Sequence, residues 1–291
     1  MMPSARLCTE SPIPHWSYSG GRVHHLRSSS FKSFVANKYM HATTGRLRLL
    51  LCLVLPTASL LAAETNKATP ASPKKEDPQP VIVDPGPVGG PPSDAIVLFD
   101  GKDLSKFRGQ RAAEPHWKIE AGILESTSPG GIFSKEEFSD CQLHVEFATP
   151  SVVKGAGQGR GNSGVYLMGR YEIQILDSYE SKTYPNGQCG AFYGHNPPLV
   201  NACRQPGEWQ TYDIIFHPPK RLADGKVRDG SFTVLQNGVL IQDHIPVAET
   251  NTAAAPLKNF AEKGPLFLQD HRNPVRFRNV WIRKLNSPTE Q

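Results

Sequence analysis

The sequence predicts an all-β domain of the sandwich or jelly-roll class. From residue 94 onward apolar residues recur with a period of two, as in residues 141–147 and 171–175, and this spacing is typical of strands that bury one face. Asn237-Gly238 separates two such stretches, and this dipeptide is the strongest short signal for a β-hairpin. No stretch has the spacing of an amphipathic helix, so we expect about ten to twelve short strands with frequent turns.

Alternation along the strands assigns side chains to faces of a sheet. Successive side chains in a strand point to opposite sides, so within residues 171–175 Glu172 and Gln174 face away from the core together. In the strand that we expect at residues 266–271, Gln269 and His271 share a face. These polar faces are the places where a curved sheet could hold a ligand. The other expected strands are residues 117–120, 123–126, 232–236, 239–242 and 275–284.

The N-terminal part of the chain has a different composition. Arg46 and Arg48 precede an apolar run at residues 49–55, and small residues follow as far as position 63, an order typical of a secretory signal peptide. The run is far shorter than the ~20 apolar residues that a membrane span needs. We therefore expect an upstream or disordered extension at residues 1–39, a signal peptide at 40–63 that starts at Met40, and export to the periplasm or outside the cell. After signal removal we expect no membrane span.

Residues 64–93 are rich in proline, which disfavours helices and sheet pairing alike, so we expect an exposed linker there. The globular domain then occupies residues 94–286, and residues 287–291 form a tail. The formal charge of +5 comes entirely from residues 1–63, and the rest of the chain has a net charge of about −1. A neutral domain lacks the electrostatic footprint of a nucleic-acid-binding protein.

Three cysteines lie in the expected domain. Cys141 alternates with apolar residues on one strand face, which predicts a buried free thiol. Cys189 and Cys203 flank a loop rich in Gly, Pro and Asn. In an oxidising compartment such a pair can close into a disulfide, and the alternative is two unlinked thiols.

Five segments together resemble a known family. They are FDGKDLSKF (99–107), WKIEAGILES (117–126), GNSGVYLMGRYEIQILDSY (161–179), CGAFYGHNPPLVNACRQPGEWQTYDIIF (189–216) and LFLQDHRNPVRFRNVWIRKL (266–285). The chain resembles the 3-keto-disaccharide hydrolase family over essentially all of residues 94–286. This resemblance implies a concanavalin A-like lectin/glucanase jelly roll. It also implies cleavage of glycosides that carry a ketone at sugar carbon 3, and some members of the family are 3-keto-glucoside lyases or 3-keto-2-hydroxy-glucal hydratases.

The chemistry of such a substrate defines what the site needs. A ketone at C3 acidifies the hydrogen on C2, so a base can remove it, the C1 substituent can leave by elimination, and water can add to the product. The site needs a base, a donor near the C3 oxygen and a proton for the leaving group. An ordinary glycosidase instead needs two carboxylates, and the strand at 171–175 offers one carboxylate and one amide. A non-catalytic carbohydrate-binding module remains a further alternative.

Glu172 and His271 are the candidate catalytic residues. Glu172 is the carboxylate on the polar strand face, and its alternative is a solvated position. Histidine is the side chain best suited to act as an acid or base near neutral pH, so His271 is the second candidate, and its alternative is a structural role. Side chains that could contact a sugar, or serve as turn, edge, core or ion-pairing residues, are Asn162, Tyr166, Arg170, Gln174, Asp177, His195, Asn201 and Gln269.

The sequence identifies no cofactor. His271, Glu172 and Asp270 could contribute ligands to a divalent cation, but no stretch has the spacing of a known metal motif, so the metal is unassigned. The expected partner is a carbohydrate substrate. Neither the sugar, the linkage nor the oligomeric state follows from the sequence.

Overall fold

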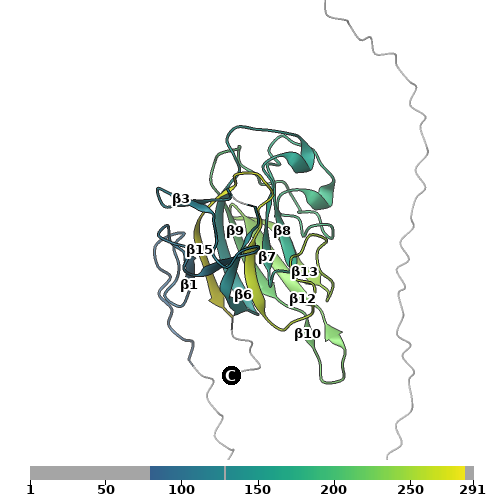
Figure 1. Cartoon of the computed structure of the whole chain (residues 1–291). Helices are drawn as coiled ribbons and strands as arrows, with labels where there is room; N and C mark the ends of the chain where they lie inside the picture. The colour runs from purple at the N-terminus through teal and green to yellow at the C-terminus, as the bar shows by residue number, and fades with distance from the viewer. Residues whose placement is uncertain (1–78, 128, 286–291) are drawn as a thin grey trace, which may run out of the picture. The chain divides into compact units, whose positions relative to one another are not determined.

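The computed structural model describes residues 79–127 and 129–285 (Figure 1). These residues form strands, turns and two short 3-10 segments, and no α-helix occurs among them. The prediction of an all-β antiparallel sandwich is therefore confirmed. Expectations for the extension, the signal peptide, Met40, the linker before residue 79 and the tail lie outside the described residues. No helix in the described residues is long and apolar enough to cross a membrane.

The larger sheet has eight strands. It runs in the order β13-β12-β9-β6-β15-β4-β3, and β1 pairs with β15 outside this path. Its strands are β1 (Ile96–Phe99), β3 (Lys118–Glu120), β4 (Ile123–Glu125), β6 (Cys141–Ala148), β9 (Gln210–His217), β12 (Gly230–Gln236), β13 (Val239–Val247) and β15 (Arg276–Lys284).

The smaller sheet has five strands in the order β2-β5-β14-β7-β8. Its strands are β2 (Phe107–Gly109), β5 (Ile132–Phe138), β7 (Ser163–Leu167), β8 (Tyr171–Ile175) and β14 (Gly264–Leu268). A small ribbon joins β10 (Lys220–Arg221) and β11 (Val227–Arg228), and the 3-10 segments are η1 (Gly157–Gly159) and η2 (Pro185–Gly187).

The main core lies between the two sheets. Tyr171 on β8 meets Phe216 on β9 with ring centroids 5.8 Å apart. Ile173 and Ile175 are fully buried in the same cluster, so the face that alternation assigns to the core is confirmed for this strand. Cys141 is buried and free, as expected. Its thiol pKa lies above the ordinary value because burial disfavours the thiolate.

The predicted hairpin at Asn237-Gly238 forms, and a second hairpin joins β3 to β4. Ala121 and Gly122 have φ of 50° and 77°, and Asn237 and Gly238 have φ of 53° and 79°. Two consecutive positive φ angles define the turn whose twist matches that of paired strands, and Asn-Gly adopts it at low cost. These turns fix the register of β3 on β4 and of β12 on β13.

The end of the expected linker is folded against the domain. The amide of Ser93 donates to the Asp84 carbonyl at 2.9 Å. Asn279 on β15 donates its side-chain amide to the Gly89 carbonyl at 2.6 Å. Residues 84–93 are thus a turn tied to the larger sheet rather than a free linker.

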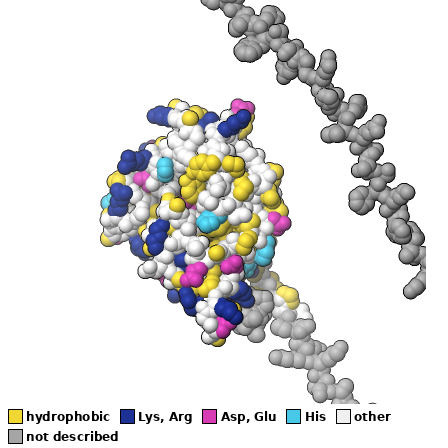
Figure 2. All heavy atoms as spheres, turned by 90° about the vertical axis from the view of Figure 1, so that its right-hand side faces the viewer, with side chains coloured by type: hydrophobic (Ala, Val, Ile, Leu, Met, Phe, Trp, Pro, Cys, Tyr) yellow, Lys and Arg dark blue, Asp and Glu magenta, His cyan; other side chains and the backbone are white. Residues whose placement is uncertain are grey.

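The surface on the side of β13 is mixed in character. Hydrophobic side chains lie among polar ones there, and charges of both signs are present (Figure 2). Exposed apolar residues in the described chain include Leu199, Val200, Val239 and Leu240.

Candidate active site

One row of side chains crosses the outer face of the smaller sheet, away from the main core. Strand register places Arg108 opposite Phe133, Phe133 opposite Phe267, and Phe267 opposite Tyr166. The row ends on β8, where Tyr166 is paired with Glu172. Residues far apart in sequence therefore form one surface that runs from a cation through aromatic rings to a carboxyl group.

The aromatic part of this row forms a second apolar cluster. Phe133, Tyr166 and Phe267 pack there with Ala255 and Leu257. Phe267 lies 4.5 Å from the Phe133 ring and 5.4 Å from the Tyr166 ring, measured between centroids. Because Ala255 and Leu257 belong to the loop at residues 248–263, that loop covers this part of the sheet.

Glu172 is buried at the end of the row. Its side chain is 2% exposed, and burial raises the pKa of this carboxyl to about 8, although a hydrogen bond with Tyr166 opposes the rise. Gly164, on the neighbouring strand, makes room for it. A Cβ at that position would collide with Glu172 Oε1 and would lie 2.7 Å from Tyr166 Cε2. Glu172 points away from the core, as expected, but it lies beneath other side chains rather than in an open groove.

Gln174 is buried beside Glu172 and belongs to a chain of amides. In one orientation its Nε2 donates to Gln158 Oε1 at 2.9 Å, and Asn162 Nδ2 donates to the Gln158 carbonyl at 2.7 Å. In the reverse orientation the Gln174 amide donates to Glu172 Oε1 at 3.0 Å and to the Ser163 carbonyl at 2.9 Å. The first orientation turns the amide oxygen toward Glu172 and suits a protonated carboxyl group, whereas the second suits a carboxylate.

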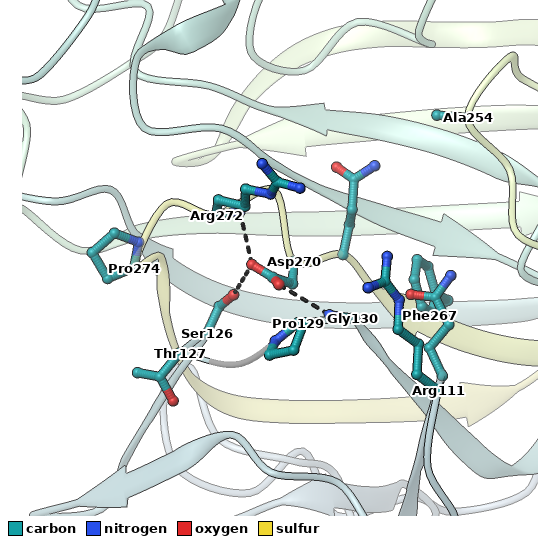
Figure 3. A pocket seen from close by; sticks show the side chains of 12 residues that line it. Arg111, Ser126, Thr127, Pro129, Gly130, Ala254, Phe267, Asp270, Arg272 and Pro274 are labelled. Atoms are coloured by element: carbon teal, nitrogen blue, oxygen red, sulfur yellow. Dashed lines mark hydrogen bonds between the residues drawn. The ribbon is translucent and has the colours of Figure 1, made fainter.

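Gln269 links this buried group to a cavity. Its Nε2 donates to the Tyr166 hydroxyl at 2.9 Å, and its Oε1 has no hydrogen-bond partner. Gln269 lines a cavity of about 600 Å³ whose wall also includes Gln110, Arg111, Ser126, Thr127, Pro129, Gly130, Ala254, Phe267, Asp270, Arg272 and Pro274 (Figure 3). Sequence pattern placed Gln269 and Tyr166 on the list of candidates, and the structure brings the two into contact.

Asp270 is the carboxylate among the described residues that line this cavity, and it is firmly held. Its Oδ1 accepts from Ser126 Oγ at 3.1 Å and from the Arg272 amide at 2.8 Å. Its Oδ2 accepts from the Gly130 amide at 3.1 Å. Figure 3 shows these contacts between the segments that carry Ser126 and Arg272, with Arg111 on another wall of the cavity.

His271 does not lie on a strand, and the expected strand at 266–271 is wrong at its end. β14 stops at Leu268. The chain then turns because Asp270 accepts from the backbone of Arg272, whose φ is 61°. His271 is exposed in this turn, and among the described residues its side chain has no hydrogen-bond or ion-pair partner. The shared face of Gln269 and His271 is therefore lost, and Glu172 and His271 have different environments.

Arg170 is buried in the turn between β7 and β8 and holds the covering loop. Its Nε donates to Asn251 Oδ1 at 2.6 Å, and its Nη2 donates to the Glu249 carbonyl at 2.6 Å. The Arg170 carbonyl accepts from the amide and the hydroxyl of Thr252. Arg170 thus shapes the cavity indirectly, since the loop it anchors supplies Ala254 to the cavity wall.

Asp177 and Asn162 belong to a neighbouring region. Asp177 is buried and accepts from Arg160 Nε at 2.6 Å through its Oδ2. The Asn162 backbone amide donates to Asn273 Oδ1 at 2.9 Å. Asp177, Arg160 and Asn273 line a second cavity of about 310 Å³.

His195 and Asn201 lie in the segment at residues 187–203, and neither lines the 600 Å³ cavity. His195 is exposed and stacks on Phe192 with ring centroids 4.5 Å apart. Asn201 shapes its loop, because its Nδ2 donates to the Ser178 carbonyl at 2.8 Å and its Oδ1 accepts from the Cys203 amide at 3.1 Å.

The expected disulfide between Cys189 and Cys203 is not present, and both residues are free thiols. The side-chain amide of Gln236 donates to both sulfurs, at 3.5 Å and 3.4 Å. Cys189 Sγ also contacts the Tyr212 hydroxyl at 3.0 Å. Cys189 is buried and Cys203 is half-buried, and these polar contacts hold the two unlinked thiols near each other.

Within residues 79–127 and 129–285, no group of three His, Cys, Asp or Glu side chains could hold a metal ion. The three residues considered as ligands from the sequence therefore do not form such a group. Glu172 is buried, Asp270 is used by three donors, and His271 is exposed in its turn.

Several residues of the cavity carried no signal in the sequence. Phe267 looks like a core residue because it sits in an unbroken apolar run. Arg111 and Ser126 lie in segments that reach the cavity only through the pairing of the sheets. One signal was available, since Asp270 and Arg272 flank His271 in the LQDHR stretch.

The fold and the cavity define the protein as a lectin/glucanase-like β-sandwich. The 3-keto-alpha-glucoside-1,2-lyase-like domain family matches residues 94–283, and the chain belongs to this family. Family and fold together support a carbohydrate-related hydrolase or lyase activity.

Solved structures agree with this assignment. A "putative glycosyl hydrolase" from Parabacteroides distasonis ATCC 8503 is 42% identical with a TM-score of 0.67, and the match covers 73% of this chain and 95% of that chain. A second protein of that description from the same organism is 20% identical with a TM-score of 0.50 over 66% of this chain and 94% of its own, which shows the shared fold. No curated protein matches the chain.

Proposed function

We propose that this domain cleaves glycosides that carry a ketone at C3. A base removes the C2 proton to give an enediolate, the C1 substituent leaves, and water adds to the unsaturated sugar, for a net hydrolysis. The observation that carries the proposal is the Gln269 amide, whose nitrogen donates to Tyr166 and whose buried oxygen has no partner, on a side chain that lines the 600 Å³ cavity.

The cavity suits a sugar ring. Its volume lies within the range of about 300–1,000 Å³ that is typical of small-molecule sites. Gln269 Oε1 is a buried acceptor without a donor. A sugar hydroxyl group would supply that donor. Phe267 adds a small apolar contact to the wall, since most of its ring is packed against Phe133 and Tyr166.

The charges at the cavity favour an enediolate over an ordinary glycosidase reaction. Arg111 and Arg272 line the cavity, and cations there stabilise the negative charge that develops on the C3 oxygen. Among the described residues that line the 600 Å³ cavity, Asp270 is the single carboxylate. Ordinary glycoside hydrolysis uses a pair of carboxylates. The arrangement therefore supports elimination beside a ketone.

Glu172 and His271 have different roles in this proposal. Glu172 is sealed from the cavity and is a positioning residue. When Glu172 is ionised it accepts the Tyr166 proton, and the Gln269 nitrogen then faces Tyr166. His271 is exposed between Asp270 and Arg272, two residues of the cavity wall, and it takes up the C2 proton.

The test is to incubate the full chain with a 3-keto-disaccharide and with the same disaccharide unoxidised, in deuterated water, and to follow products by mass spectrometry. We expect cleavage of the oxidised sugar alone, with deuterium entering at C2. His271→Ala should lower turnover by about 10²-fold or more. Binding of both sugars without turnover would identify a carbohydrate-binding module, and cleavage of the unoxidised sugar would identify an ordinary glycosidase. Either result overturns the proposal.

A further inference from the structure

A second cavity lies on the other side of the turn that follows β14. Its volume is about 310 Å³, and it shares Pro274 with the 600 Å³ cavity. Arg272 lines the first cavity and Asn273 lines the second. One short turn therefore separates the two spaces, and a molecule bound in one lies close to a molecule bound in the other.

Asp177 gives the second cavity a polar group that lacks a partner. Asp177 is 3% exposed. Its Oδ2 is held by Arg160 at 2.6 Å, while its Oδ1 is buried with no hydrogen-bond partner. A carboxylate can only accept hydrogen bonds, and a buried acceptor without a donor is costly. A ligand in this cavity is therefore favoured if it donates a hydrogen bond to Asp177.

The rest of the wall has acidic, cationic and apolar parts, and Glu125 is the acidic residue there besides Asp177. Lys154 and Arg276 add donors to the lining. Pro150, Val152 and Val153 add apolar surface, and Val152 is 68% exposed at the rim. A ligand that fits has hydroxyl groups on its edge and C–H groups on its face, which is the character of a sugar ring.

The two cavities share a frame of hydrogen bonds. Asn273 Oδ1 accepts from the Asn162 backbone at 2.9 Å, and Asn162 Nδ2 donates to the Gln158 carbonyl at 2.7 Å. In either orientation the side-chain amide of Gln174, the neighbour of Glu172, lies 2.9 Å from Gln158 Oε1. The wall of the second cavity is thus tied to the residues that surround the buried carboxyl group.

We propose that the second cavity is the subsite for the leaving group, and that this group is a second sugar whose hydroxyl donates to Asp177 Oδ1. The inference rests on the proposed function. A purely apolar leaving group would bury Asp177 Oδ1 without a donor, and sites built around a hydrogen bond reject ligands that lack it. The subsite therefore selects a sugar over a phenyl group of similar size.

The test uses the full chain and compares three substrates: a 3-keto-disaccharide, methyl 3-keto-glucoside and phenyl 3-keto-glucoside. We expect kcat/KM for the disaccharide to exceed that for the phenyl compound. Asp177→Asn presents a donor where the cavity had an acceptor, because Arg160 holds the remaining oxygen. It should lower the ratio of kcat/KM for the disaccharide to that for the methyl glucoside by about tenfold, as expected for one lost hydrogen bond to a charged group.

A second variant avoids the buried ion pair. Val153→Trp narrows the cavity from its rim, where Val153 is 46% exposed, and Val239→Trp is the matched control at 44% exposure on β13. We expect Val153→Trp alone to lower the same ratio. An unchanged ratio in Asp177→Asn and Val153→Trp, with thermal melting showing both folded, would overturn the subsite.

A further arm separates this inference from the proposed function. Saturation-transfer NMR with free glucose needs no turnover. If no keto-sugar is cleaved, the proposed function fails, and the subsite is then judged by glucose alone. Glucose signals that are lost in Val153→Trp and kept in Val239→Trp support a sugar site in this cavity. Glucose signals of equal strength in Val153→Trp and Val239→Trp contradict it.

Discussion

The Gln269 side chain donates to the Tyr166 hydroxyl at 2.9 Å, and Tyr166 lies opposite the buried Glu172 across β7 and β8, where it lowers the pKa of that carboxyl group. A hydroxyl group has one proton to donate, and here that proton is directed to Glu172 when the carboxyl is ionised. The Gln269 nitrogen must then face Tyr166, which leaves the Gln269 oxygen free. The protonation state of a side chain outside the cavity thus influences the polarity of the cavity wall.

Tyr166→Phe should disturb this arrangement. The change removes the acceptor for the Gln269 amide and a donor to Glu172, so we expect a loss of about 1–3 kcal/mol in the free energy of unfolding. The Glu172 pKa should rise further, because the lost hydrogen bond favours the ionised form. Urea denaturation gives the first quantity, and NMR titration of a 13C-labelled carboxyl group gives the second. A Glu172 pKa unchanged by the substitution would show that the hydroxyl has no influence on it.

Glu172→Gln should change how stability depends on pH. Burial raises the pKa of Glu172 to about 8 from an ordinary value of 4.5. Below pH 4.5 Glu172 is protonated in both the folded and the unfolded state, and its contribution to the free energy of unfolding is then at its maximum. Between pH 4.5 and 8 the unfolded state releases the proton first, so stability falls as pH rises.

We therefore expect wild-type protein to lose stability relative to Glu172→Gln between pH 5 and pH 8, by an amount on the order of a few kcal/mol. Thermal melting across this range measures the difference. Glu262→Gln, at an exposed position, is the matched control and should follow the wild type. Parallel curves for wild type and Glu172→Gln would contradict a raised Glu172 pKa.

Gly164→Ala should crowd the same group. The added Cβ would collide with Glu172 Oε1 and lie 2.7 Å from Tyr166 Cε2. Overpacking of this kind costs about 1–3 kcal/mol, and we also expect lower activity, because Tyr166 must shift away from Gln269. Gly159→Ala is the control, since its Cβ would meet no atom within 4 Å. Equal melting temperatures for the two variants would refute the tight fit.

Arg170→Met should loosen the covering loop. Its guanidinium group makes hydrogen bonds at 2.6 Å to Asn251 Oδ1 and to the Glu249 carbonyl, and bonds from charged groups are worth about 1.5–3 kcal/mol each. We expect a lower melting temperature and faster tryptic cleavage after Lys258. Arg228→Met, at an exposed position on β11, should change neither. Unchanged proteolysis in Arg170→Met would show that the loop is held by other contacts.

Export remains a prediction from the sequence. We expect a mature N-terminus near Glu64 and loss of export in Met40→Ala. N-terminal sequencing of the secreted protein tests the first point, and immunoblotting of cell fractions tests the second. Undiminished export of Met40→Ala, together with peptides from residues 1–39, would rule out Met40 as the initiator.

The strands were predictable because their signals are local. Alternation located β6 and β8, and Asn237-Gly238 located a hairpin, since these depend on neighbours in sequence. The end of β14 was missed because it is set by the Asp270 side chain, which turns the backbone at Arg272. The prediction that His271 shares a strand face with Gln269 was wrong for the same reason, because His271 lies beyond the end of β14.

The candidate site was less predictable for a similar reason. Alternation correctly turned Glu172 away from the core, but it gives no information on what lies above a sheet face. The loop at residues 248–263 buries Phe267, and the segment at 190–193 lies along β8. Both are long-range contacts, so the burial of Glu172 and the cavity beside Gln269 required the folded structure.

The pairing of residues 190–193 with β8 protects one edge of the smaller sheet from contact with other protein chains. β8 is the last strand of the smaller sheet, and an open strand edge is a template on which other chains can assemble. Here the Gly190 amide donates to the Gln174 carbonyl at 2.8 Å, the Gln174 amide to the Ala191 carbonyl at 3.0 Å, and the Tyr193 amide to the Glu172 carbonyl at 3.1 Å. The strand that carries the buried carboxyl group therefore has no free backbone along this stretch to recruit a neighbouring chain, and the protein is guarded there against edge-to-edge aggregation.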